Sequence, residues 1–262
     1  MKENQPAVGK ATSLISIASV VIGLAAWFAL ASSGLFSSIL LPKPAELWRV
    51  AVMLVTEGYA GRSFWSSYAI SLLRVAAGFG IAVVAGSVIG MAMGLNRTIG
   101  GLLYPLIEIY RPLPALAYYS LLVLLLGIDE SSKIAVLALG GLPPIVLATW
   151  DATASVRPER VEGARSLGLS RWQVICRVIF PSCLPDILTG ARIGFGLSFT
   201  TLVAAEMIAA TSGLGWMVYQ ASQYAESAVV IVGLIVMGVT GIAVDAGFRA
   251  LQSWLVPWVG KG

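Results

Sequence analysis

The chain has 262 residues, of which 58% are hydrophobic and only 11% are charged, and its mean hydropathy is +0.87. A soluble domain is about 45–50% apolar and about 25% charged, so a single water-soluble core cannot bury this much apolar surface. The chain has no histidine, which excludes His-ligated zinc, Ser-His-Asp triads and histidine proton relays, and no G-x-x-x-x-G-K-[ST] segment that could cradle ATP phosphates. The composition predicts an all-α membrane protein with no catalytic residues, no metal site and no cofactor of its own.

Apolar stretches close to the length of a membrane-spanning helix recur along the chain, separated by short polar breaks. About 20 apolar residues cross the roughly 30 Å of hydrocarbon as a helix. We predict six spans, near residues 13–33, 70–95, 112–128, 132–151, 188–210 and 228–250. The first is longer than the apolar region of a secretory signal, about 7–15 residues, so we interpret it as an uncleaved membrane helix.

The segment 34–62, between the first two spans, has a different pattern. Pro42 and Pro44 break the chain, and the apolar residues after them recur at helical spacing. These residues are Leu47, Val50, Ala51, Leu54 and Val55. We expect a short interfacial helix that lies on the outer membrane surface.

Small residues form a stripe in the second span. Gly86, Gly90 and Gly94 recur at every fourth position. In lipid, small residues let two helices approach closely, because association depends on packing and not on the exclusion of water. The stripe therefore predicts a helix–helix contact and not a ligand site.

The basic residues are unequally divided between the two sides of the predicted bundle. If both termini are cytoplasmic, ten Lys and Arg residues lie in the inner segments 1–12, 96–111, 151–187 and 251–262, and three lie outside. The inner ten are Lys2, Lys10, Arg97, Arg111, Arg157, Arg160, Arg165, Arg171, Arg177 and Lys261, and the outer three are Lys43, Arg49 and Arg62. The excess of inner positive charge predicts cytoplasmic N- and C-termini and an even number of spans.

Ionisable residues inside the spans need a partner or a function, because burying a charge in lipid is costly. The spacings of Asp245 with Arg249 and of Glu108 with Arg111 predict ion pairs along a helix. Arg74 lies about one turn inside the outer edge, where its side chain either extends outward to the interface or meets an anionic substrate.

Arg192 and Glu206 share one predicted helix but lie about 21 Å apart along it, so they cannot pair within one chain. We expect Arg192 to meet carbonyl groups, lipid headgroups or Asp186. Glu206 either lines a water-filled path, binds the backbone of a neighbouring helix or pairs with an arginine of a second copy. The candidate path residues are Tyr118, Ser198, Thr200, Thr201 and Glu206. The side chains of Tyr118 and Tyr119 point to different sides, so at most one readily faces this path.

The longest inner loop, 151–187, carries five arginines and has a regular local pattern. A first helix can run up to Gly168, which permits a sharp break at its C-terminus. Ser170 can then cap a second short helix, which we expect to end at Pro181 and Pro185. The pattern predicts a helix-turn-helix on the cytoplasmic face.

This loop resembles the E-A-A-x3-G-x9-I-x-L-P loop of ABC importer permeases. Residues 162–168 read Glu-Gly-Ala-Arg-Ser-Leu-Gly, and residues 178–181 read Val-Ile-Phe-Pro. Gly163, Val178 and Phe180 depart from the motif but keep its small or apolar character. The resemblance implies that the loop docks on a separate ATPase subunit through Glu162, Ala164, Arg165, Gly168, Ser170, Arg171, Trp172, Val174, Ile175 and Val178. A basic loop in solvent would account for the arginines but not for the glycine and proline spacing.

Further segments resemble the nitrate, sulfonate and taurine branch of these permeases, and most of all its taurine members. They are residues 41–44, 71–75 with 78–79, 110–114, 201–211 and 213–215, whereas 115–120 departs from the pattern. The resemblance implies a type I importer fold in one transmembrane domain, 1–262, with its core at about 64–250. It also implies a location in the bacterial inner membrane. Taurine or another aliphatic sulfonate is the expected substrate, and nitrate or bicarbonate is the alternative.

The resemblance also implies partners. These are a second copy of the chain, two ABC ATPase subunits that carry ATP and magnesium, and a periplasmic or lipid-anchored substrate-binding protein, with no nucleic acid. An ATP-independent channel or secondary transporter is the alternative class. A secondary transporter needs ion-coupling carboxylates and usually internal repeats, and the sequence offers one candidate acid, Glu206, and no repeat.

Overall fold

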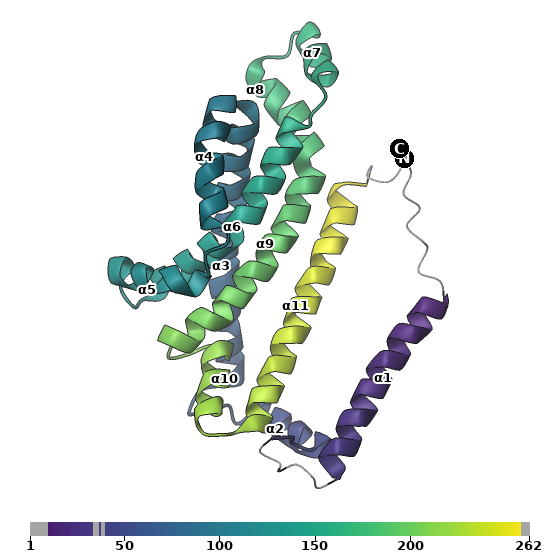
Figure 1. The fold of residues 1–262 in the computed structure, drawn as a ribbon, viewed down its shortest axis with the longest axis vertical. Coiled ribbons are helices and arrows are strands. Elements are labelled where there is room, and N and C mark those ends of the chain that lie inside the picture. The colour runs from purple at the N-terminus through teal and green to yellow at the C-terminus, as the bar shows by residue number, and fades with distance from the viewer. Residues whose placement is uncertain (1–9, 34–36, 38–39, 258–262) are drawn as a thin grey trace.

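The structure is a computed structural model that describes residues 10–33, 37 and 40–257, and it is helical along most of them. Within this part, the strand-like feature is a single bridge between Tyr59 and Arg62. The helices are α1 Lys10–Ser32, α2 Pro44–Thr56, α3 Phe64–Leu95, α4 Arg97–Tyr110, α5 Ala115–Leu126, α6 Glu130–Ala154, α7 Pro158–Ser166, α8 Arg171–Val174, the π-helix η1 Ile175–Ile179, α9 Phe180–Ala209, α10 Leu214–Gln223 and α11 Ser227–Leu255. Figure 1 shows α7 and α8 at one end of an elongated bundle and α2 and α10 at the other. Lys2, Lys261 and residues 34–36 and 38–39 of the predicted outer segment lie outside the described residues.

Four helical stretches in the described part are long and apolar enough to cross a membrane. They are α3, α6, α11 and the continuous stretch Arg171–Ala209, which ends in α9. These stretches confirm the predicted spans near 70–95, 132–151, 188–210 and 228–250, although α9 begins earlier than predicted. The first predicted span coincides with α1, and the predicted total of six requires counting α1 and the pair α4–α5 as one crossing each.

The third predicted span, 112–128, is wrong as a straight crossing. The segment 96–111, predicted to lie on the inner side between two spans, contains the helix α4, which meets α5 at a bend of 104°. Pro112 and Pro114 remove two backbone N–H donors within three residues, which favours a break in the helix at this point. The result is a broken helix pair beside α6 and α9.

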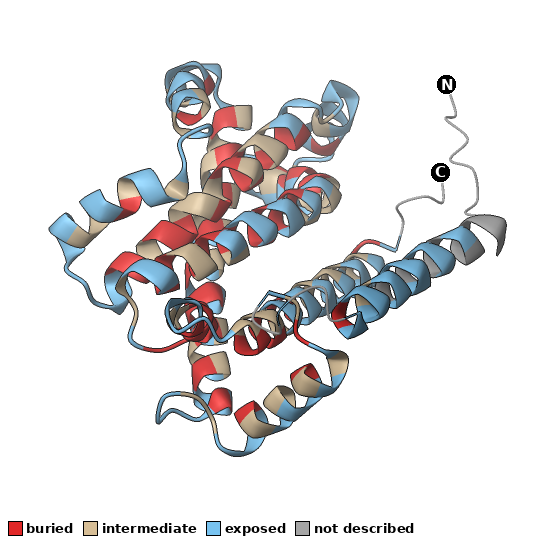
Figure 2. Cartoon of the chain, turned by 60° about the horizontal axis from the view of Figure 1, so that its bottom comes forward, coloured by how far each residue is buried: buried red, intermediate tan, exposed pale blue. Residues whose placement is uncertain are grey.

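The glycine stripe of α3 is confirmed as a packing contact with α6. A Cβ atom at Gly86 would lie 2.8 Å from the side chain of Ile145, and one at Gly90 would overlap the carbonyl oxygen of Val146. Gly94 likewise faces α6, where a Cβ would overlap Thr153. Figure 2 shows the buried residues concentrated in the middle of the bundle, whereas α1 is largely exposed along its described length.

We expect Gly90→Ala to lower the free energy of unfolding by about 1–3 kcal/mol, because the backbone of α6 blocks the added methyl group. The thermal unfolding midpoint of the detergent-solubilised chain measures this effect. Gly80→Ala is the matched control, since Gly80 lies on the same helix and a Cβ there would meet nothing within 4 Å. Equal midpoints for the two variants would contradict the packing role of the stripe.

Helix α2 confirms the predicted short helix, but its buried face is narrower than expected. Leu47 and Leu54 are buried in a cluster with residues of α3 and α11, and Val50 and Ala51 pack beside them. Val55, predicted on the same face, is 46% exposed. The location of α2 on a membrane surface stays a prediction.

Candidate coupling loop and membrane cavity

Helix α7 ends at the predicted glycine. Gly168 has a φ of +84°, and its N–H donates to the carbonyl of Arg165 over 2.9 Å. The N–H of Leu169 donates to the carbonyl of Ala164 over 3.2 Å. These two bonds form a Schellman motif, which satisfies carbonyl groups at a helix end and requires a left-handed residue. A Cβ at Gly168 would meet nothing within 4 Å, so the backbone conformation, and not space, favours glycine here.

Ser170 caps the N-terminus of helix α8, as predicted. The Ser170 hydroxyl accepts a hydrogen bond from the Gln173 N–H, and the Gln173 side chain accepts one from the Ser170 N–H over 2.8 Å. This is a capping box. The sequence analysis missed the role of Gln173, although a Ser followed three residues later by Gln is a recognisable signal for it.

The prediction that Pro181 and Pro185 end this second helix is wrong. The chain continues from α8 through η1 into α9 without a break. At the end of η1, the Phe180 N–H donates to the carbonyl of Ile175, five residues back. This wider turn directly before Pro181 accommodates a residue that has no N–H to donate. The loop is therefore joined rigidly to α9.

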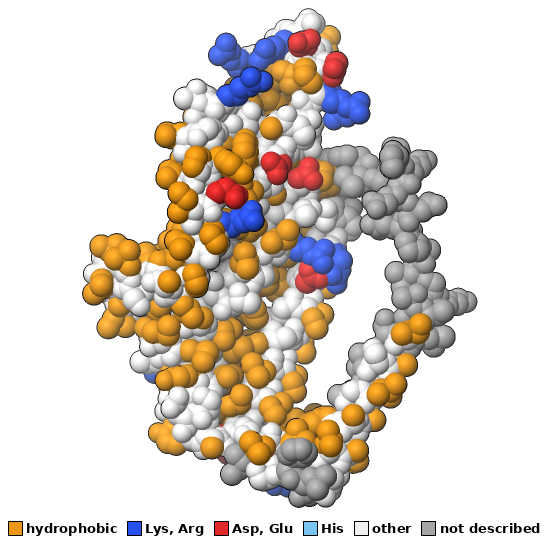
Figure 3. All heavy atoms as spheres, in the orientation of Figure 1, with side chains coloured by type: hydrophobic (Ala, Val, Ile, Leu, Met, Phe, Trp, Pro, Cys, Tyr) orange, Lys and Arg blue, Asp and Glu red, His pale blue; other side chains and the backbone are white. Residues whose placement is uncertain are grey.

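The loop has a buried side and an exposed side. Ala164, Val174 and Ile179 are buried in a cluster with residues of α6 and α9. Trp172 is 71% exposed and Leu167 is 82% exposed. Of the ten predicted coupling residues, two are buried (Ala164, Val174), two are half-buried (Ile175, Val178) and six are exposed (Glu162, Arg165, Gly168, Ser170, Arg171, Trp172). Figure 3 shows basic side chains gathered at this end of the bundle.

A second site, which we call the buried charge cluster, is made by the buried residues Arg74, Glu206 and Lys133 together with Glu130, whose side chain is 55% exposed. Arg74 is 4% exposed and Glu206 is fully buried. One Arg74 amino group donates to Glu206 over 2.7 Å, and the rest of the guanidinium binds both carboxylate oxygens of Glu130 over 2.6 Å. Lys133 also donates to Glu130, over 3.1 Å. The cluster joins α3, α6 and α9.

The outward extension predicted for Arg74 is wrong. Its donors are taken by Glu206, Glu130 and the carbonyl of Ser212. A charge held in apolar surroundings is far more stable beside a paired carboxylate than alone. The pairing of Arg74 with Glu206 joins residues far apart in the sequence, whereas Glu130 and Lys133 are three residues apart and offered a local signal that was missed.

The backbone after α9 completes the surroundings of Glu206. Its carboxylate accepts hydrogen bonds from the Ser71 hydroxyl over 2.7 Å and from the Gly215 N–H over 2.8 Å. A Cβ at Gly213, whose φ is +118°, would overlap this carboxylate. Of the alternatives for Glu206, binding to the backbone of a neighbouring helix is therefore present, together with an arginine of the same chain.

The other predicted ion pairs are present. Arg111 and Glu108 pair over 3.4 Å, and Asp245 binds Arg249 on the same helix. Asp245 also binds Arg192 of α9. The partner of Arg192 is therefore a carboxylate on α11, and not the carbonyl groups, lipid headgroups or Asp186 that we expected.

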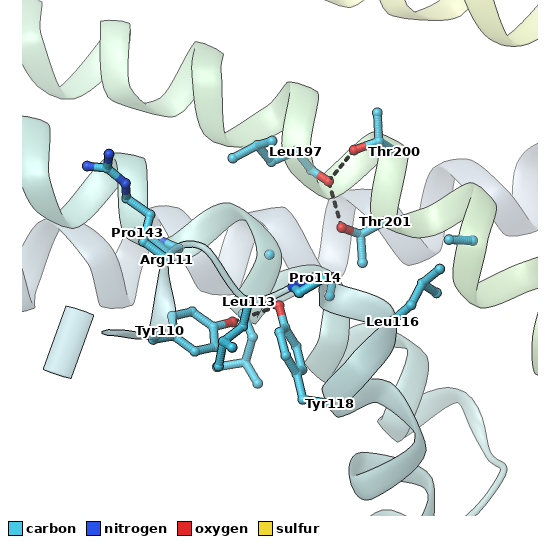
Figure 4. Close-up of a pocket in the computed structure, with 14 residues that line it drawn as sticks. Tyr110, Arg111, Leu113, Pro114, Leu116, Tyr118, Pro143, Leu197, Thr200 and Thr201 are labelled. Atoms are coloured by element: carbon cyan, nitrogen blue, oxygen red, sulfur yellow. Dashed lines mark hydrogen bonds between the residues drawn. The ribbon is translucent and has the colours of Figure 1, made fainter. Parts of the chain in front are cut away.

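A cavity of about 360 Å³, which we call the membrane cavity, lies between the α4–α5 bend, α6 and α9. Its polar lining residues are Tyr110, Arg111, Tyr118, Thr200 and Thr201 (Figure 4). Three of the five predicted path residues therefore come together here.

The other two predicted path residues lie elsewhere. Glu206 belongs to the buried charge cluster, and Ser198 is fully buried and donates to the carbonyl of Leu137 over 2.9 Å. Tyr119 is also fully buried, and its hydroxyl has no hydrogen-bond partner in the described part of the chain. The prediction that at most one of Tyr118 and Tyr119 faces the path is consistent with this placement, since Tyr118 lines the cavity.

Comparison with known proteins defines the class of this helical membrane protein. Residues 78–261, more than half of the chain, match the family described as "Binding-protein-dependent transport system inner membrane component". A chain of the MetNI methionine ABC transporter in an inward facing conformation has the same fold, with a TM-score of 0.59 and 18% identity over 71% of this chain and 93% of that one.

Relatives of known name are similar over most of their length. The taurine transport system permease protein TauC of Escherichia coli is 41% identical over 94% of this chain and 90% of that protein. The putative aliphatic sulfonates transport permease protein SsuC of E. coli is 36% identical, over 90% and 89%. The nitrate import permease protein NrtB of Synechocystis is 34% identical, over 71% and 68%. The chain belongs to the family of binding-protein-dependent inner membrane permeases of ABC importers, in the branch of these relatives, as its sequence predicted.

Proposed function

We propose that the chain is the membrane-spanning subunit of an ATP-driven importer of taurine or another aliphatic sulfonate. The observation that carries this proposal is the 41% identity to a taurine permease over 94% of the chain. The relative named as a nitrate permease covers less of the chain at lower identity, so nitrate or bicarbonate is the second candidate.

The proposed assembly contains two copies of the chain, two ATPase subunits with ATP and magnesium, and a substrate-binding protein. The exposed side of α7 and α8, with Trp172 at its centre, is the proposed docking surface for an ATPase subunit. This surface and α2 lie at opposite ends of the bundle (Figure 1). The arrangement supports cytoplasmic termini, an outer α2 and a binding protein that docks at the end with α2 and α10.

The continuity of α8 with α9 supports a direct mechanism of coupling. Closure of the ATPase subunits would displace α8, and η1 transmits that displacement to α9 because no flexible loop separates them. Helix α9 carries Thr200 and Thr201 of the membrane cavity. A rigid-body movement of this kind can switch the path between its two sides.

Reconstitution into proteoliposomes tests the proposal. The chain is combined with its ATPase and binding protein, and the hydrolysis of ATP and the uptake of labelled taurine are measured. We expect taurine-loaded binding protein to raise hydrolysis several-fold, and uptake to require ATP. Solute movement without ATP, with hydrolysis unchanged by the binding protein, would support a channel or secondary transporter instead. Stimulation by nitrate and not by taurine would select the second candidate substrate.

A further inference from the structure

The membrane cavity lies at a place where a membrane protein can hold a polar solute. It lies beside the middle of α6, at Gly140 and Pro143, and beside the non-helical turn between α4 and α5. Non-helical backbone at membrane depth is tolerated only where it is buried in protein or lines a water-filled cavity, and broken helices form solute sites in other transporters. A volume of about 360 Å³ is at the lower end of the range for ligand sites, about 300–1,000 Å³, which suits a small solute.

One side of the cavity offers hydrogen-bond donors. The Tyr110 hydroxyl donates to the Tyr118 hydroxyl over 2.8 Å, so the proton of Tyr118 remains available to a third group (Figure 4). Helix α5 begins beside it at Ala115, and its N-terminus has no side-chain cap. The first N–H groups of a helix have no partner within the helix and carry partial positive charge. This side of the cavity is therefore suited to the oxygens of an anionic group.

The opposite side offers acceptors. The hydroxyls of Thr200 and Thr201 both donate to the carbonyl of Leu197, over 2.9 and 2.8 Å. Because their protons are used in this way, their oxygens can only accept a hydrogen bond from a solute. Figure 4 shows these two bonds on α9, across the cavity from Tyr118 on α5. An ammonium group is a donor that such oxygens can bind.

The charges around the cavity favour a solute with no net charge. Arg111 lies at the rim, paired with Glu108, and its guanidinium is directed away from the two tyrosine hydroxyls (Figure 4). Among the described residues that line the cavity, no other side chain carries a charge. The one cation in this lining, Arg111, is already paired with Glu108, whereas a zwitterion needs no added cation and meets donors at one end and acceptors at the other.

We propose that the membrane cavity is a transient binding site for a small aminosulfonate on its way through the membrane. The Tyr118 hydroxyl and the N-terminus of α5 donate to the sulfonate, and the oxygens of Thr200 and Thr201 accept from the ammonium group. This inference rests on the proposed function and adds to it a site on the permease that distinguishes an aminosulfonate from a simple anion.

Proteoliposomes with the complete importer test the site. Taurine moved per ATP hydrolysed is measured with the binding protein saturated, so that delivery does not limit the result. We expect Tyr118→Phe to lower this ratio about fivefold, the effect of losing one hydrogen bond, while hydrolysis stimulated by taurine-loaded binding protein is retained. Tyr119→Phe is the matched control, because it removes the neighbouring hydroxyl, which lies outside the cavity, and should leave the ratio unchanged.

The threonines are tested by their selectivity. Thr200→Val with Thr201→Val should reduce the transport of 2-aminoethanesulfonate about fivefold relative to 2-hydroxyethanesulfonate, which has no ammonium group. Thr189→Val is the control, since Thr189 makes the same type of bond on the same helix, to the carbonyl of Pro185 over 2.9 Å, outside the cavity.

An equal fall in the transport of both solutes would overturn the assignment of the ammonium group. Unchanged transport in the tyrosine and threonine variants, with stimulated hydrolysis intact, would overturn the site and leave the proposed function standing. Wild-type hydrolysis that does not respond to taurine-loaded binding protein would instead overturn the proposed function itself.

Discussion

Replacing Glu206 with leucine is expected to lower the free energy of unfolding by about 3–5 kcal/mol, the usual cost of removing one partner of a buried ion pair. The substitution leaves the N–H of Gly215 without its acceptor and takes one acceptor from an Arg74 amino group, which keeps its bond to the carbonyl of Ser212. The denaturation midpoint of the purified chain in detergent measures the loss.

A double variant separates the cost of an unpaired charge from the worth of the pair. When both members of a buried pair become apolar, stability is often recovered, so Arg74→Met with Glu206→Leu should be more stable than Glu206→Leu alone. Glu108→Gln is the control on an exposed pair, where Arg111 is 58% exposed, and it should cost about 0–1 kcal/mol. If Glu206→Leu costs no more than Glu108→Gln, the buried charge cluster does not stabilise the bundle.

The coupling loop could be predicted in detail because its determinants are local. The end of α7 depends on whether one residue, Gly168, adopts a left-handed conformation, and the start of α8 depends on Ser170 and the residue three positions later. Such motifs use hydrogen bonds between residues only a few positions apart. The prediction that the second helix ends at Pro181 failed for the same reason. A proline in the sequence does not show whether a π-helix before it will let the helix continue.

The buried charge cluster could not be predicted, because it joins residues that only the tertiary fold brings together. Arg74 on α3 and Glu206 on α9 are separated in the sequence by the α4–α5 pair and α6, and neither has the other at helical spacing. The sequence indicated that each charge needed a partner but not which one. The same reason explains why Arg192 was not paired with Asp245. Of the three predicted path residues that line the cavity, Thr200 and Thr201 are neighbouring hydroxyls on α9, which is a local pattern, and Tyr118 lies on α5.

Replacing Gly168 with aspartate is expected to reduce ATP-driven uptake more than tenfold and to weaken the association of the ATPase, while the chain still inserts in the membrane. At a φ of +84°, a side chain costs about 1 kcal/mol relative to glycine. A negative charge at the C-terminus of α7 also opposes the helix dipole. Both effects disturb the angle between α7 and α8 without touching the packed helices, since the glycine has open space around it.

Two further variants show whether the backbone strain or the added charge causes the loss of uptake in Gly168→Asp. Gly168→Asn tolerates the left-handed conformation better than most residues and adds no charge, so it should retain more uptake than Gly168→Asp. Gly163→Ala, in the helical part of the same loop and with nothing within 4 Å of its added Cβ, should match the wild type. Co-purification of the ATPase with the tagged permease, measured beside uptake, shows whether docking is the step that is lost. Normal uptake by Gly168→Asp would contradict the coupling role of this loop. The ATPase could then dock on the surface around Trp172 without the Schellman turn that orients this surface.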